Sequence, residues 1–156
     1  MKISAQEEYG IRCLLEIGRS GPGASLTIPE ISRAEQISHH YVAKLLRVLR
    51  RGGLVKSVRG QAGGYKLARP LNRITVSEVL AVLGGQLYDP AFCDQHGGAE
   101  TVCSHNTIDC SIRSLWRNVQ QAVDQLLGNT TLDALLPPDL PSAASVALTE
   151  IRPAIR

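Results

Sequence analysis

Three of the chain's four cysteines lie close together, since Cys93, Cys103 and Cys110 fall within eighteen residues. Thiolates are the usual protein ligands of iron-sulfur clusters, and they also bind zinc and react reversibly with oxidants. In a reducing compartment such a group is more typical of a metal or redox centre than of a disulfide framework. The cysteines therefore predict a site that responds to metal supply or redox state.

The rest of the chain favours the cytoplasm, which is such a compartment. No apolar run approaches the roughly 18 residues that span a membrane. Residues 1–8 also lack the apolar core of a signal peptide. We therefore expect a cytoplasmic protein with no membrane partner.

Two histidines are alternative metal ligands near the clustered cysteines, and the fourth cysteine lies far from them in the sequence. His96 and His105 lie in the same stretch and can bind a metal through an imidazole nitrogen, although an exposed loop histidine is more often solvated. Cys13 lies at helical spacing with apolar residues near the N-terminus, which is typical of a small core residue. Zinc fits less well than iron-sulfur because the cysteines lack the Cys-x-x-Cys pairs of structural zinc sites.

The charge of the chain is divided between its halves. Residues 1–75 hold thirteen Lys and Arg against five Asp and Glu, whereas residues 76–156 hold four against nine, so the halves carry about +8 and −5. A basic half neutralises phosphates and releases their counterions, as nucleic-acid binders do. A solvated charged surface is the alternative interpretation.

Helical periodicity and capping residues predict three helices in the basic half. The first covers residues 4–19, with its apolar residues on one face. Thr27 and Glu30 form a capping box that begins a short helix over 28–36. Ser38 caps a third helix, and two helices joined by so short a turn indicate a helix-turn-helix. The second helix of such a pair lies in the major groove of DNA.

The third helix carries most of the candidate DNA-binding residues. Its N-terminal residues are the ones that reach base edges in a helix-turn-helix, and its basic side chains can pair with phosphates. The candidates on this helix are Ser38, His39, His40, Tyr41, Lys44 and Arg47.

A β-hairpin follows the third helix. Residues 54–59 alternate as a strand, residues 65–67 return as its partner, and a glycine-rich turn at 60–64 joins them. A hairpin in this place is a wing, and Arg59 with Gly60 can enter the narrow minor groove, where the negative potential is greatest. For any single basic residue here, a plain surface charge is the alternative.

The acidic half is less regular. Thr75 and Glu78 form another capping box, which begins a fourth helix that ends at Gly84. Residues 86–107 read as a long irregular loop that holds two of the clustered cysteines. A long helix is expected over 108–128, where the helix dipole would favour the thiolate of Cys110.

The long helix has apolar residues that step by four and three, as in a heptad seam. This seam would pair two subunits or pack against the subunit's own first helix. The seam positions are Ile108, Ile112, Leu115, Val119, Ala122 and Leu126. Residues 129–156 are expected to hold a short helix at 130–136 and a loosely ordered tail.

The predicted fold is therefore mainly α with a small β-hairpin wing. It combines a winged helix-turn-helix domain (1–85), a cysteine-containing loop (86–107), a dimerisation helix (108–128), and a short helix with a tail (129–156). A helix-turn-helix that reads palindromic DNA ordinarily works as a dimer, which favours the intersubunit interpretation of the seam.

These features resemble a known family, the IscR/NsrR-type winged helix-turn-helix transcriptional regulators (Rrf family), over roughly residues 1–136. The resemblance lies in the opening Met-Lys-Ile-Ser with Glu8 and Tyr9, in the runs at 37–45 and 53–65, and in three cysteines before a long helix. It implies a homodimer whose subunits cross by the long helix and read a roughly palindromic, double-stranded operator.

The resemblance also implies that Cys93, Cys103 and Cys110 hold an iron-sulfur cluster that tunes DNA affinity. Two departures bear on this site: the cysteines are spaced more widely than in the better-known members, and Arg113 stands where the cluster regulator has a histidine ligand. Glu8 matches the acidic ligand of the nitric-oxide-sensing repressor. Glu8, from either subunit, is therefore the expected fourth ligand.

Alternatives remain open for the site and for its function. Glu8 can instead form an i, i+4 ion pair with Arg12. A 2Fe-2S cluster is preferred by family precedent, with 4Fe-4S as the alternative. A regulator of the same fold without a cluster, using its thiols directly or holding zinc, is the second hypothesis. The sequence has no nucleophile-base pair or phosphate loop, so we expect neither an enzyme nor a small-molecule substrate.

Overall fold

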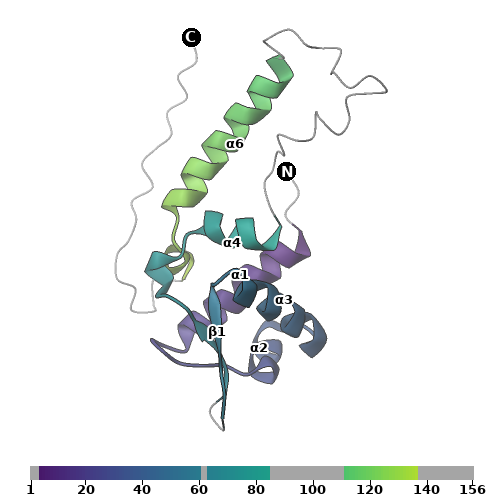
Figure 1. The fold of residues 1–156 in the computed structure, drawn as a ribbon, viewed down its shortest axis with the longest axis vertical. Helices are drawn as coiled ribbons and strands as arrows, with labels where there is room; N and C mark the ends of the chain where they lie inside the picture. Colours follow the sequence, from purple (N-terminus) through teal and green to yellow (C-terminus); the bar gives the residue numbers. More distant parts are fainter. Residues whose placement is uncertain (1–3, 61–62, 85–110, 137–156) are drawn as a thin grey trace.

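The computed structural model describes residues 4–60, 63–84 and 111–136, and it is mainly helical with one two-stranded hairpin (Figure 1). None of its helices in these ranges is long and apolar enough to cross a bilayer. The elements in chain order are α1 (Ala5–Arg19), α2 (Ile28–Glu35), α3 (His39–Arg51), β1 (Val55–Val58), β2 (Gly64–Leu67), η1 (Leu71–Arg73), α4 (Val76–Leu83), α6 (Ser111–Asn129) and η2 (Leu132–Leu135).

The capping residues set the starts of the helices, as predicted. Thr27 begins α2 through a reciprocal box, in which its N–H donates to Glu30 Oε2 at 2.7 Å and its hydroxyl accepts from the Glu30 N–H at 3.4 Å. The same arrangement with Thr75 begins α4. An additional box of Ser4 and Glu7 begins α1. Each box satisfies amides that have no partner within the helix.

The core forms where α1, α2, α3 and α4 meet, and each helix contributes an apolar face. Leu14, Ile31, Leu46 and Val79 are fully buried there. Cys13 is buried among them with a free thiol, which confirms its interpretation as a core residue. Burial raises the pKa of this thiol to about 12, with the Glu35 charge adding to the effect, so Cys13 stays protonated at neutral pH.

The wing is the antiparallel pair β1–β2, with Ser57 opposite Tyr65. A short third contact anchors it: the Leu26 N–H donates to the Tyr65 carbonyl at 3.0 Å, and the Tyr65 N–H donates to the Leu26 carbonyl at 2.8 Å. Gly64 is required at this junction, because its φ is +150° and a Cβ would clash with the Leu26 carbonyl. The wing is therefore fixed to the segment that precedes α2.

The segment that follows α6, which includes η2, packs against the core formed by α1 to α4. The Val76 N–H donates to the Thr130 carbonyl and the Leu132 N–H to the Ile74 carbonyl, each at 2.9 Å. Leu132 is fully buried in the core. Within the range 130–136, where a short helix was predicted, the structure has the 3-10 helix η2 (Leu132–Leu135). The predictions for residues 86–107, for 108–110 and for the tail after 136 lie outside the described residues.

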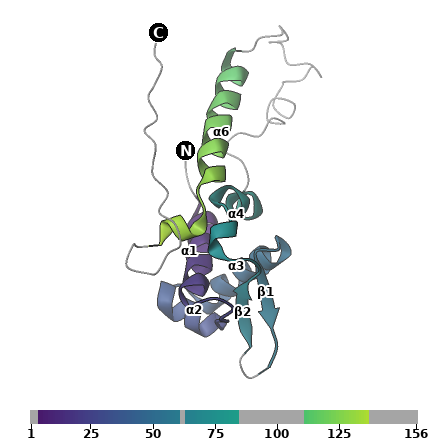
Figure 2. The ribbon, with the colours of Figure 1, turned by 90° about the vertical axis from the view of Figure 1, so that its left-hand side faces the viewer.

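The C-terminal end of α6 lies beside the start of α4, and from there the helix extends away from the body (Figures 1 and 2). Its base is anchored by Leu127, which packs against the core. Along its length Leu115, Trp116 and Leu126 remain 55%, 47% and 49% exposed. Ala122 is exposed as well, so three positions of the predicted heptad seam, Leu115, Ala122 and Leu126, are open in the isolated subunit.

Candidate DNA interface and metal ligands

The predicted helix-turn-helix is formed by α2 and α3, and its turn depends on one residue in the left-handed region. Gln36 ends α2 with φ 57° and ψ 38°, and the Ile37 N–H then donates to the Ser32 carbonyl at 3.2 Å. The Ser32 hydroxyl donates to the Ile37 carbonyl, which closes the turn from its other side. Ser38 follows and caps α3 by accepting from the Tyr41 N–H at 3.3 Å.

The outward face of α3 holds the DNA-binding candidates. Its inward face is fully buried, at Val42, Leu45, Leu46 and Leu49, so the opposite side chains are directed to solvent. His39, His40, Lys44 and Arg47 are exposed. A row of imidazoles and cations on an open helix face can contact bases and phosphates.

Tyr41 is held more firmly than its neighbours. Its ring is half-buried and meets the Tyr9 ring of α1 edge to face, with 6.0 Å between centroids and 89° between planes. The Lys44 ammonium lies 5.9 Å from the centroid of the same ring. Tyr9 and Tyr41 thus join α1 to the N-terminal part of α3, a contact that the sequence analysis missed.

The wing presents Arg59 and Gly60 at its exposed end. Gly60 has φ +101° with nothing near the position of a Cβ, and its carbonyl accepts from the Gly63 N–H at 2.9 Å. Gly60 thus supports the turn of the hairpin, and the exposed Arg59 side chain can approach a groove.

Glu8 is half-exposed on α1 and pairs with Arg12, whose Nε donates to Glu8 Oε1 at 2.8 Å. This hydrogen bond and the Glu8 charge raise the pKa of the Arg12 guanidinium, with a further contribution from Glu35. The ion pair that competed with the ligand hypothesis is therefore formed in this structure. An exposed pair of this kind is weak enough to exchange for another partner.

The start of α1 packs against the end of α4. The Gln6 amide donates to the Leu83 carbonyl, and a Cβ at Gly84 would clash with the Glu7 carboxylate. The segment with the clustered cysteines begins directly after Gly84. Glu8 therefore lies on the helical turn next to the point where that segment leaves the body.

The predicted thiolate ligands Cys93, Cys103 and Cys110, and the rival ligands His96 and His105, lie outside the described residues. Within residues 4–60, 63–84 and 111–136, no group of three or more His, Cys, Asp and Glu side chains is placed to hold a metal ion. Of the expected ligands, only Glu8 has a described position.

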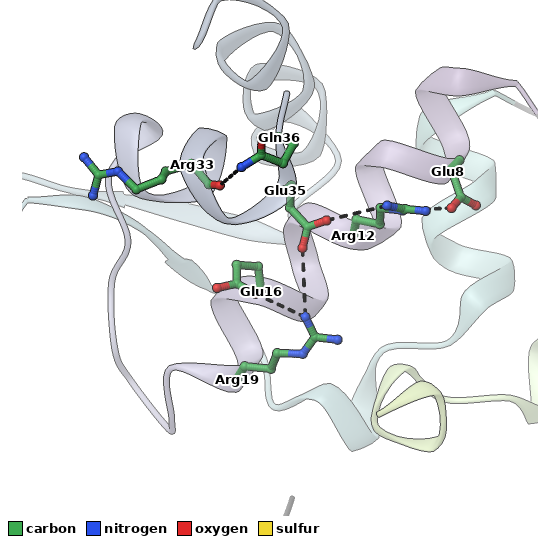
Figure 3. Close-up of polar contacts among 7 residues, drawn as sticks. All are labelled: Glu8, Arg12, Glu16, Arg19, Arg33, Glu35 and Gln36. Carbon is green, nitrogen blue, oxygen red and sulfur yellow. Dashed lines mark hydrogen bonds and ion pairs between the residues drawn. The ribbon is translucent and has the colours of Figure 1, made fainter. Parts of the chain in front are cut away.

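An ion-pair network between α1 and α2 was not anticipated from the sequence (Figure 3). Glu35, at the end of α2, is 10% exposed and lies between two arginines of α1. Its Oε2 is 4.0 Å from Arg12 Nη1, and its Oε1 is 3.9 Å from Arg19 Nη1. Arg19 also pairs with Glu16 at 3.2 Å. The arginines are seven residues apart, two helical turns, which was the available sequence signal.

Comparisons with known proteins agree with this arrangement. The family described as "Rrf2: Iron-dependent Transcriptional regulator" matches residues 3–138. Protein rrf2 of Nitratidesulfovibrio vulgaris is 33% identical over 136 residues, which cover 87% of each chain. The family description names a transcriptional regulator, as the sequence predicted, and not an enzyme.

Solved structures give the same result for the fold. The structure described as CymR, "the Global Cysteine Regulator of B. subtilis", is 30% identical with a TM-score of 0.68 and covers 86% of this chain and 95% of its own. T. potens IscR is 27% identical with a TM-score of 0.67, covering 86% and 85%. The predicted winged-helix fold is confirmed by these likenesses.

Proposed function

Because the chain belongs to the Rrf2 family of transcriptional regulators, we propose that it is a homodimeric DNA-binding regulator whose operator affinity is controlled by an iron-sulfur cluster. The proposed ligands are Cys93, Cys103, Cys110 and Glu8. The observation that carries this proposal is that Glu8 lies on the first turn of α1, whose neighbouring residues Gln6 and Glu7 pack against the end of α4, from which the cysteine segment continues.

The chemistry of the donor set fits such a cluster. Thiolates are its usual ligands, and a carboxylate at the fourth position binds soft iron-sulfur centres less firmly than a thiolate would. The Glu8 side chain is half-exposed and reachable by a ligand. A bound cluster would supply a centre that responds to redox state, nitric oxide or iron supply. We propose a 2Fe-2S cluster, with 4Fe-4S as the alternative.

DNA reading is proposed to use α3 and the wing together. The exposed side chains of α3 would lie in the major groove, with His39, His40 and Lys44 nearest the bases. Arg59 and Gly60 would reach the adjacent minor groove. Two subunits paired through α6 would place two copies of α3 on a roughly palindromic operator.

A cluster-free thiol sensor is the second candidate. The name of the B. subtilis relative refers to cysteine and not to iron, and the same three thiols could form a disulfide or sulfenic acid on oxidation. In that case DNA affinity would follow the thiol redox state without iron.

The test is a visible absorption spectrum, with iron and sulfide analysis, of protein purified without oxygen. We expect bands between roughly 320 and 460 nm with iron and sulfide in matching amounts. Replacing Cys103 by Ala should abolish them while leaving a folded dimer, whereas the matched variant Cys13→Ala should keep them. Colourless, iron-free wild-type protein would contradict the cluster and favour the thiol sensor.

A further inference from the structure

Arg12 is shared between two acids that belong to different parts of the molecule. Its Nε donates to Glu8, the proposed ligand, at 2.8 Å, and its Nη1 lies 4.0 Å from Glu35. Glu8 is half-exposed, whereas Glu35 is 10% exposed. Screening by water weakens the outer pair more than the inner one. The shorter contact of Arg12 is therefore with Glu8, the acid whose charge water screens more strongly.

Glu35 has a structural position that matters for DNA reading. It is the last residue of α2, directly before Gln36 and its left-handed turn, and α3 begins four residues after it, at His39. The arginines that flank Glu35 are both on α1. The strength of these contacts therefore bears on how firmly the helix-turn-helix is held against α1.

We infer that Glu35 is a positioning residue for DNA binding, and that it competes with Glu8 for Arg12. Use of the Glu8 carboxylate as a metal ligand would remove the nearest acid from Arg12. Within the described residues, Glu35 is the other acid that pairs with Arg12, so the guanidinium would turn toward it. The contact between α1 and the end of α2 would tighten, and α3 would be held more rigidly for binding.

This inference rests on the proposed function only for the role of Glu8 as a ligand. The exchange of partners at Arg12 can be tested without any metal. Glu8→Gln removes the carboxylate charge from Arg12, as ligation would, and a glutamine cannot replace the lost ion pair. The variant therefore imitates the effect of ligation on Arg12 in metal-free protein.

The experiment measures operator affinity of chelator-treated full-length protein for a duplex selected from a random DNA library. Glu8→Gln should bind this duplex about two- to fivefold more tightly than the wild type, the range of one exposed ion pair. In a Glu35→Gln background the same replacement should have no effect. Thermal unfolding of every variant checks that folding is intact, which a purely structural role of Glu35 would disturb.

Asp124→Asn is the matched control for charge. It removes one exposed carboxylate from α6, where its partner is Gln120 and not an arginine of α1, and it should leave affinity unchanged. Unchanged or weaker binding by Glu8→Gln would overturn the inference, as would tightening that persists without Glu35. If the protein binds no cluster, the visible spectrum will lack the expected bands. The comparison of Glu8→Gln in the wild-type and Glu35→Gln backgrounds uses metal-free protein and can still be interpreted in that case.

Discussion

Helices α3 and α6 are both amphipathic, but they differ in what covers their apolar faces. The inward residues of α3, Leu45 and Leu46 among them, are fully buried by the subunit itself. On α6, Leu115 and Leu126 remain about half exposed. The winged body therefore completes its own core, whereas α6 presents an apolar face with no cover among the described residues.

This difference assigns different roles to the outward surfaces of the two helices. Because the apolar side of α3 is satisfied within the subunit, its polar side is available for DNA. An apolar stripe of Leu115, Val119, Ala122 and Leu126 on α6 is suited to a second copy of the same helix. Replacements on the two helices should therefore affect different properties.

The largest expected effect comes from the buried face of α3. Leu46→Ala should lower the free energy of unfolding by about 2–5 kcal/mol, because it removes buried methyl groups and leaves a cavity. Urea denaturation measures this, and Arg47→Ala, on the exposed side of the same helix, should stay within about 0.5 kcal/mol. A similar small loss for both variants would show that the two faces do not differ as described.

The apolar face of α6 should respond through assembly. Leu126→Lys should weaken the dimer at least about tenfold, because each subunit would place an unpaired ammonium in the proposed interface. Sedimentation velocity at several concentrations measures the dissociation constant. Gln121→Lys, on the exposed polar side of α6, should leave it unchanged. A dimer that tolerates Leu126→Lys would mean that α6 is covered by something other than a second copy.

The features that sequence reasoning predicted well are those specified locally. Capping boxes at Thr27 and Thr75 fixed the starts of two helices within one residue, because the side chain and the amide that it satisfies are three residues apart. The wing followed from strand alternation and glycines in the same way. One local signal was overlooked, the Ser4 and Glu7 box at α1.

The features that were missed join residues far apart in the chain. Glu35 meets Arg12 and Arg19 only because α2 packs across α1, and Tyr9 meets Tyr41 because α3 packs against α1. No periodicity within one helix encodes such contacts. The prediction of the fourth ligand met a similar problem. The sequence allowed Glu8 either to pair with Arg12, four residues later on the same helix, or to bind a metal, and neither possibility conflicts with the neighbouring residues.

The smallest expected effect concerns one exposed arginine on each of the two helices. Arg47 on α3 and Arg117 on α6 are both exposed, so each can be replaced by Ala at little cost in stability. Arg47→Ala should weaken operator binding and reduce the slope of log affinity against log salt by about 0.9, the share of one phosphate contact. Arg117→Ala should change neither, because α6 extends away from the helix-turn-helix (Figure 1). DNA titrations at several salt concentrations measure the slope for each variant. Equal slopes for the two variants would mean that α3 does not make the DNA contact that its exposed polar face suggests.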